Sequence, residues 1–248
     1  MNTIAKLLFS AYLLSASVIS YAELRLDIKY LGLSQNFNDI PSSNRADYDR
    51  VVALWDKQKE EITADLIVSG EVLNIPKRTP PIRWGGSGHA HAIFNGKDYY
   101  IRAFYYQNAK QTQENHQSTI ENREGIAVPG GGVCMLYVQD KDLNKAASLK
   151  IALPENNFGT WCNGVDGLGA AGKGRDGVIV ALSYYLTGKA PAKKVQDIGQ
   201  GWRYMTVLIR WREENGKLIL TQDDSCLGNP NKIKDIPSAR KALDKCGV

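Results

Sequence analysis

Two of the chain's Asn-Gly dipeptides, Asn95-Gly96 and Asn215-Gly216, constrain its fold more than any other feature of the sequence. Each stands between runs rich in β-branched and aromatic residues, HAHAIF and KDYYIRAFYY around the first and WRYMTVLIRWREE and KLIL around the second. Asn-Gly favours the two-residue turn whose twist matches that of paired antiparallel strands. The sequence therefore predicts two β-hairpins that turn at these dipeptides.

Other runs predict further strands, and two stretches predict helices. The predicted strands are LRLDIKYLGL, ADLIVSGEVLNI, GGVCMLYVQD, SLKIALP and GVIVALSYYLTG. Apolar residues at helical spacing, with Asn44 and Asp47 resembling a capping box, predict a helix from about 44 to 62. A proline at a favoured first-turn position begins a short C-terminal helix over about 237–245. We expect a mainly β chain of the α+β class, an antiparallel sheet or sandwich with these two helices.

The first 22 residues have the order of a secretory signal peptide: one lysine (Lys6), an apolar run from Leu7 to Ile19, and small residues up to Ala22. The apolar run is too short for a membrane anchor, which needs about 20 residues. We expect cleavage after about Ala22 and a periplasmic or secreted protein. Residues 23–248 are expected to form a single β-rich domain, with a candidate sub-boundary near residue 80. The net charge of +5 is small and its charges are dispersed, so it does not indicate a nucleic-acid partner. No stretch after the first 22 residues is apolar enough to span a membrane.

All four cysteines, Cys134, Cys162, Cys226 and Cys246, lie in the part expected to be exported. An even number of cysteines in an oxidising compartment predicts two disulfides, which four cysteines can form in three ways. Pairing of neighbours, Cys134 with Cys162 and Cys226 with Cys246, is the simplest. No spacing is that of a zinc site, so the cysteines are interpreted as structural.

His89 and His91 form a His-x-His motif, a common way to present two imidazoles to one metal ion. Counting outward from Asn95-Gly96 pairs His91 with Tyr100 and His89 with Arg102. One face of the hairpin is then the core side, with Ala90, Ala92, Phe94, Tyr99 and Ile101. The other face has His89, His91, Ile93, Asp98, Tyr100 and Arg102.

The face with the histidines is predicted to bind a partner rather than a metal. A guanidinium opposite one imidazole is a poor neighbour for a cation, and Asp98, about two pairs away along the hairpin, is too far to be assumed a third ligand. Tyrosine and arginine dominate the energetics of protein interfaces. The polar stretch from Gln107 to Gly125 follows the same hairpin, and a loop of this length is usually functional or disordered. It adds Glu114 and His116 to the candidate binding residues, beside His89, His91, Tyr100 and Arg102.

The stretch GVDGLGAAGKGRDG matches the spacing of a dinucleotide fingerprint at Gly167, Gly169 and Gly172. A phosphate loop needs a strand before it and a helix after it, and neither is predicted here. We interpret the stretch as a glycine loop tethered by Cys162, and we predict no nucleotide or other cofactor. The sequence also lacks a G-x-S-x-G motif and a separated pair of carboxylates, so it offers no catalytic set.

Export, two disulfides and the absence of a catalytic set favour a non-enzymatic binding protein. The prediction is an inhibitor or immunity-type protein that binds and blocks a toxin or hydrolase. One alternative is an exported metal-dependent hydrolase that uses His89 and His91. A second alternative is an adhesin or a pilus-associated subunit. The sequence leaves the partner and the oligomeric state undetermined.

Overall fold

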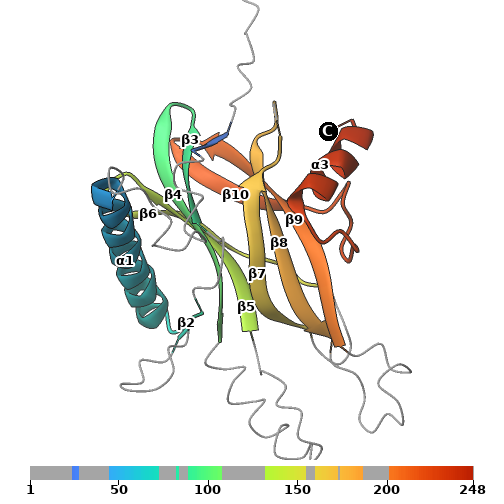
Figure 1. Ribbon diagram of the computed structural model, residues 1–248, viewed down its shortest axis with the longest axis horizontal. Helices are drawn as coiled ribbons and strands as arrows, with labels where there is room; N and C mark the ends of the chain where they lie inside the picture. Colours follow the sequence, from blue (N-terminus) through green and yellow to red (C-terminus); the bar gives the residue numbers. More distant parts are fainter. Residues whose placement is uncertain are drawn as a thin grey trace, which may run out of the picture.

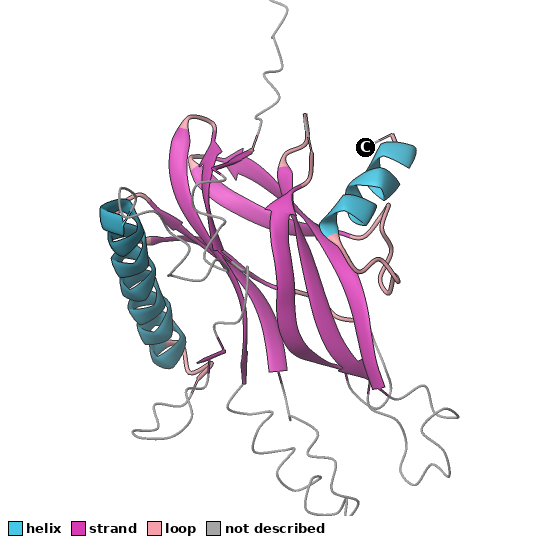
Figure 2. Cartoon of the chain, in the orientation of Figure 1, coloured by secondary structure: helices cyan, strands magenta, loops and turns pink. Residues whose placement is uncertain are grey.

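Two antiparallel sheets face each other, and a helix packs against part of the outer side of each (Figures 1 and 2). The computed structural model describes residues 24–27, 45–72, 82–83, 89–107, 132–154, 160–172, 174–186 and 201–247. Helix α1 (Arg45–Val68) lies against one sheet and helix α3 (Ile236–Lys245) against the other. The expected fold class, mainly β with one helix in the N-terminal half and a short one at the C-terminus, is confirmed.

The first sheet, sheet A, contains six strands in the described residues, in the order β1-β3-β4-β5-β6 with β2 beside β4. Their bounds are β1 Arg25–Asp27, β2 Ile82–Arg83, β3 His89–Phe94, β4 Lys97–Gln107, β5 Gly132–Asp140 and β6 Lys145–Lys150. The hairpin of β3 and β4 turns at Asn95-Gly96, where both residues have positive φ, 51° and 71°. His91 pairs with Tyr100 and His89 with Arg102, so the register predicted from the dipeptide is confirmed.

The second sheet, sheet B, has the order β10-β9-β8-β7. Its strands are β7 Thr160–Ala170, β8 Gly177–Leu186, β9 Gly201–Glu214 and β10 Lys217–Asp223. The second Asn-Gly turn joins β9 to β10 and pairs Trp211 with Leu220, as predicted. Trp211 is 2% exposed and meets Phe94 and Tyr99 of sheet A edge-on, with ring centroids 5.7 and 5.8 Å away. The apolar face of this hairpin therefore contributes to the core between the sheets.

A disulfide joins the two sheets where β5 passes close to β7. Cys134 is bonded to Cys162, and the predicted pairing of neighbouring cysteines is confirmed. A Cβ atom placed on Gly132 would lie 2.0 Å from the carbonyl oxygen of Cys162. Glycine at this position therefore allows the two backbones to approach.

The glycine-rich stretch is a strand, and its interpretation as a loop was wrong for Gly167 and Gly169. Both residues belong to β7, which pairs with β8 through two register shifts, after Cys162 and after Val165. A Cβ on Gly169 would lie 3.1 Å from the side chain of Ile236 in α3. Local propensity favours a loop here, but the glycine is needed so that α3 can pack directly on the strand.

Helix α1 runs to Val68, so the strand predicted for ADLIVSGEVLNI is wrong for residues 64–68. Among the side chains of the helix that the structure describes, those of Trp55, Gln58, Ile62 and Leu66 are buried. This spacing continues one helical stripe past residue 62. Ile62 and Leu66 of this stripe pack in one cluster with Phe104, Tyr106, Met135 and Tyr137 of sheet A, and that packing outweighs the β propensity of the last residues.

Helix α3 begins at the predicted place and is fastened at its far end. Asp235 caps it by accepting a hydrogen bond from the backbone N–H of Ser238 at 2.7 Å. Cys226 is bonded to Cys246 after the last turn, which confirms the second predicted disulfide.

Within the described ranges, no helix is both long enough and apolar enough to cross a membrane.

Candidate functional site

The predicted binding face of the first hairpin lies partly beneath α1. Arg102 is 3% exposed, so the expectation that it lies on an open binding face is wrong. Its Nε donates to Gln58 Oε1 and its Nη2 to the carbonyl oxygen of Trp55, both at 3.1 Å. Burial lowers its pKa to about 10. The register had placed Arg102 on the correct face, but the position of α1 across that face is a tertiary feature.

His91 lies beside an acid that the sequence analysis took as too distant. Its Nε2 is 2.9 Å from Asp98 Oδ1, because diagonal neighbours across a hairpin are within reach of long side chains. The His91 ring centroid is 5.5 Å from that of Tyr100, and the His91 side chain is 14% exposed. In the described residues no three His, Cys, Asp or Glu side chains gather as a metal site would require. The side chain of His89, and all of Glu114 and His116, lie outside the described residues.

A second surface, missed by the sequence analysis, lies on the outer face of sheet B. Strand alternation directs Tyr185 of β8 and Trp202 and Tyr204 of β9 away from the core. Trp202 is 46% exposed and Tyr204 is 44% exposed. The ring of Tyr185 meets that of Trp202 at 4.8 Å in an edge-on arrangement, and Tyr185 pairs on its other side with Trp161. We call Trp161, Tyr185, Trp202 and Tyr204 the aromatic row.

Small residues form the floor beside the aromatic row. Ser183 pairs with Gly164 on one side and Tyr204 on the other, and Ala181 pairs with Gly167. The residues at the two register shifts of β7, Asn163 and Asp166, have no counterpart in β8. Both carry polar side chains, which border this floor.

Asn163 and Asp166 meet at the hydroxyl of Ser183, which is 5% exposed. Asn163 Nδ2 donates to Ser183 Oγ at 3.3 Å. Partial burial raises the pKa of the Asp166 carboxyl, and a hydrogen bond with Ser183 acts in the opposite direction. The three polar groups are therefore held in place by one another.

The segment before α3 forms the opposite wall. Asn231 bonds to both backbone groups of Thr206, accepting from its N–H at 3.2 Å and donating to its carbonyl at 2.7 Å. Asn231 therefore bonds to β9 two residues before Leu208, the residue at which the pairing of β9 with β10 ends. Lys234 then stands over the ring of Tyr204, with Nζ 5.2 Å from the centroid.

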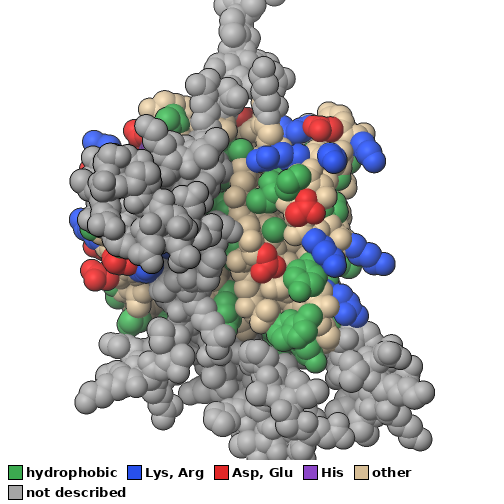
Figure 3. Space-filling view, viewed as in Figure 1, with side chains coloured by type: hydrophobic (Ala, Val, Ile, Leu, Met, Phe, Trp, Pro, Cys, Tyr) green, Lys and Arg blue, Asp and Glu red, His purple; other side chains and the backbone are tan. Residues whose placement is uncertain are grey.

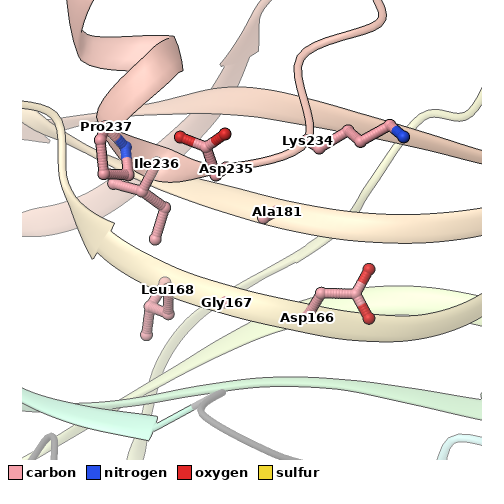
Figure 4. Close-up of a pocket in the computed structure, with 8 residues that line it drawn as sticks. All are labelled: Asp166, Gly167, Leu168, Ala181, Lys234, Asp235, Ile236 and Pro237. Atoms are coloured by element: carbon pink, nitrogen blue, oxygen red, sulfur yellow. The ribbon is translucent and has the colours of Figure 1, made fainter.

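These walls enclose a groove of about 290 Å³, which we call the sheet B groove (Figure 4). Asp166 and Lys234 lie at one end of it, and Leu168 and Ile236 lie at the other. Figure 3 shows hydrophobic side chains at the surface of the half of the molecule that carries sheet B, close to lysine and arginine side chains.

The groove offers groups for binding rather than a pair of catalytic acids. Asp235 is its second acid, but Ser238 donates to both of its carboxylate oxygens, at 2.7 and 2.9 Å. These bonds hold the pKa of Asp235 below its usual value. Hydrolysis by two carboxylates needs one as an acid and the other as a base or nucleophile. Here one of the two is committed to capping α3.

No family model matches this chain, and no curated protein or solved structure matches it either.

Proposed function

We propose that this chain is an exported, non-enzymatic binding protein that holds its ligand on the outer face of sheet B. The observation that carries the proposal is the exposure of Trp202 and Tyr204, two residues apart on one strand. Exposed large apolar side chains that gather on a soluble protein usually mark an interaction site. Aromatic rings supply much contact area at a low entropy cost.

The sheet beneath these rings is suited to hold them in fixed positions. Residues Gly177–Tyr184 of β8 are buried, and β8 is paired on both sides by β7 and β9. The Cys134–Cys162 disulfide ties this sheet to the one behind it. A rigid support reduces the entropy lost when a ligand binds.

Two disulfides are consistent with an oxidising, extracellular or periplasmic location. Residues 1–22, the proposed signal peptide, lie outside the described residues. Cell fractionation of the full-length chain, with N-terminal sequencing of the mature form, tests export. A reduced protein that keeps residues 1–22 in the cytoplasm would contradict it.

A protein partner of the inhibitor or immunity type, a toxin or hydrolase that this chain would block, remains the prediction from the sequence. The test is affinity purification of the tagged full-length chain from its native cell, compared with a Trp202→Ala/Tyr204→Ala double variant. If these rings are hot spots, each is worth about 2 kcal/mol, so the double variant should lose its co-purified partner. Arg212→Ala is the control, because Arg212 lies on the same strand with a side chain 61% exposed. Retention of the partner by a folded double variant would refute the proposed surface.

A further inference from the structure

The aromatic row and the sheet B groove form one continuous surface along β8. Tyr185, Ser183 and Ala181 alternate outward along the strand, from the rings at one end to the groove at the other. Four residues of extended strand span about 13 Å. The surface therefore has room for a short linear ligand. One part of that ligand would contact the aromatic row, and the next would contact the hydrogen-bonding groups of the sheet B groove.

We infer that this surface binds a carbohydrate chain, an inference that rests on the proposed function of this face. A sugar ring is apolar on the face that carries its C–H groups and polar along its edge, where its hydroxyls lie. Exposed aromatic rings complement the C–H face, because they offer a flat apolar body at a wet surface. Trp202, which is 46% exposed, provides such a ring, and the partly buried Tyr185 lies edge-on to it at 4.8 Å.

The polar groups beyond the rings match the hydroxyl edge of a sugar. A hydroxyl both donates and accepts hydrogen bonds, so it is best met by a mixture of donors and acceptors. Asp166 accepts, Lys234 donates, and the Asn163 amide does both. The bonds of Asn163 and Asp166 to Ser183 orient these groups before a ligand arrives, which lowers the cost of binding.

The shape of the floor favours a ring that lies flat near the backbone. Gly167 and Ala181 line the groove and present little or no side chain between its walls, and the pair Gly164 and Ser183 continues this floor toward the aromatic row. At about 290 Å³ the groove is at the lower end of the range for ligand sites, which suits a single ring rather than a large apolar molecule. Asp166 and Lys234 lie at the same end, where their charges offset each other, and the remaining acid, Asp235, is bonded to Ser238. The lining therefore favours a neutral saccharide over an anionic one (Figure 4).

A peptide fits this surface less well. Peptides that bind to sheets usually add a strand at an edge and use main-chain hydrogen bonds. The backbone of β8 is already paired with β7 and β9 over the floor of the surface. A peptide here would depend on side-chain contacts alone.

The test is binding of the mature protein to an array of neutral oligosaccharides, followed by titration calorimetry with the best ligand. We expect saturable binding. Trp202→Ala and Asp166→Ala should each weaken the affinity at least tenfold with unchanged melting temperature. Arg212→Ala should bind like the wild type. Asp166→Asn and Tyr204→Ala serve as second variants if either first variant folds poorly.

The outcomes separate this inference from the proposed function. If no oligosaccharide binds, but the Trp202→Ala/Tyr204→Ala variant loses a co-purified protein, the carbohydrate is wrong and the surface stands. If no oligosaccharide binds and the partner is retained, both fail. Saccharide binding that Trp202→Ala and Asp166→Ala leave unchanged would place the site elsewhere and overturn the inference. Cleavage of the bound saccharide would overturn the non-enzymatic part of the proposed function.

Discussion

Replacing Arg102 with alanine should destabilise the protein strongly, although the residue lies on the face of sheet A that points away from the core. The guanidinium is 3% exposed and bonds to Gln58 Oε1 and to the carbonyl oxygen of Trp55, each at 3.1 Å. Alanine removes the donor from two buried acceptors, and each such loss costs about 1–3 kcal/mol. The expected loss in the free energy of unfolding is therefore about 2 to 6 kcal/mol. The lost packing of the arginine methylenes acts in the same direction.

Urea unfolding of Arg102→Ala and of a matched control, Arg212→Ala, followed by tryptophan fluorescence, measures this loss. Arg212 is an arginine on a strand of the other sheet, its side chain is 61% exposed, and Arg212→Ala should stay within about 0.5 kcal/mol of the wild type. Arg102→Lys should fall between the wild type and Arg102→Ala, because an ammonium cannot reproduce the fork of a guanidinium. Equal midpoints for Arg102→Ala and Arg212→Ala would show that α1 does not cover this face.

Three further outcomes follow from the contacts of single residues. Trp211→Ala should lower the free energy of unfolding by about 3–5 kcal/mol, because it truncates a side chain in the core between the sheets, whereas Arg212→Ala should lower it by about 0.5 kcal/mol or less. Equal urea midpoints for the two variants would mean that the register of the second hairpin is wrong. Gly132→Ala places a methyl group 2.0 Å from a carbonyl oxygen of β7 and should lower the free energy of unfolding by about 1–3 kcal/mol. The methyl group of Gly164→Ala, the control, meets nothing closer than 3.6 Å. Similar melting temperatures for the two variants would disprove the close approach of the strands. The pKa of Asp223 is held below its usual value of about 3.9, first by a hydrogen bond from a neighbouring serine, so its contribution to stability is present above pH 4 and is lost as the pH falls through the folded-state pKa. Asp223→Asn should therefore lower the urea midpoint at pH 6 and flatten its dependence between pH 4 and 2, and an unchanged pH profile would contradict this.

The hairpins and the disulfides could be predicted because they depend on local signals. Asn-Gly sets both the turn and the register, and from the register follows the face on which each side chain lies. The neighbouring cysteines pair as the shortest loops would suggest. These features need no knowledge of how distant segments pack.

The errors arose where packing between distant elements decides the outcome. Ile67 and Val68 have strand-forming side chains, but Leu66 completes a buried stripe on sheet A and the helix continues. Gly169 looks like a loop residue until Ile236 is seen to pack on it.

The candidate site could not be located from the sequence for a related reason. The alternation of Tyr185, Trp202 and Tyr204 with the core residues of their strands was visible, and it could have indicated an outward row. Whether these side chains are exposed depends on where β10 ends and on which part of sheet B is covered by α3. Arg102 shows the opposite case, a residue on an outward face that a helix then covers.

The two helices differ in how they are attached, and this should appear in hydrogen exchange. Helix α3 is tied by the Cys226–Cys246 bond, whereas α1 is held by noncovalent contacts such as the hydrogen bond from Lys145 to Asp65 at 2.9 Å. Amides of α1 can therefore exchange through a partial opening that leaves both sheets folded, at a lower free energy than global unfolding. The slowest amides should be those of β8, a central strand whose residues Gly177–Tyr184 are buried and which exchanges only when the whole molecule unfolds.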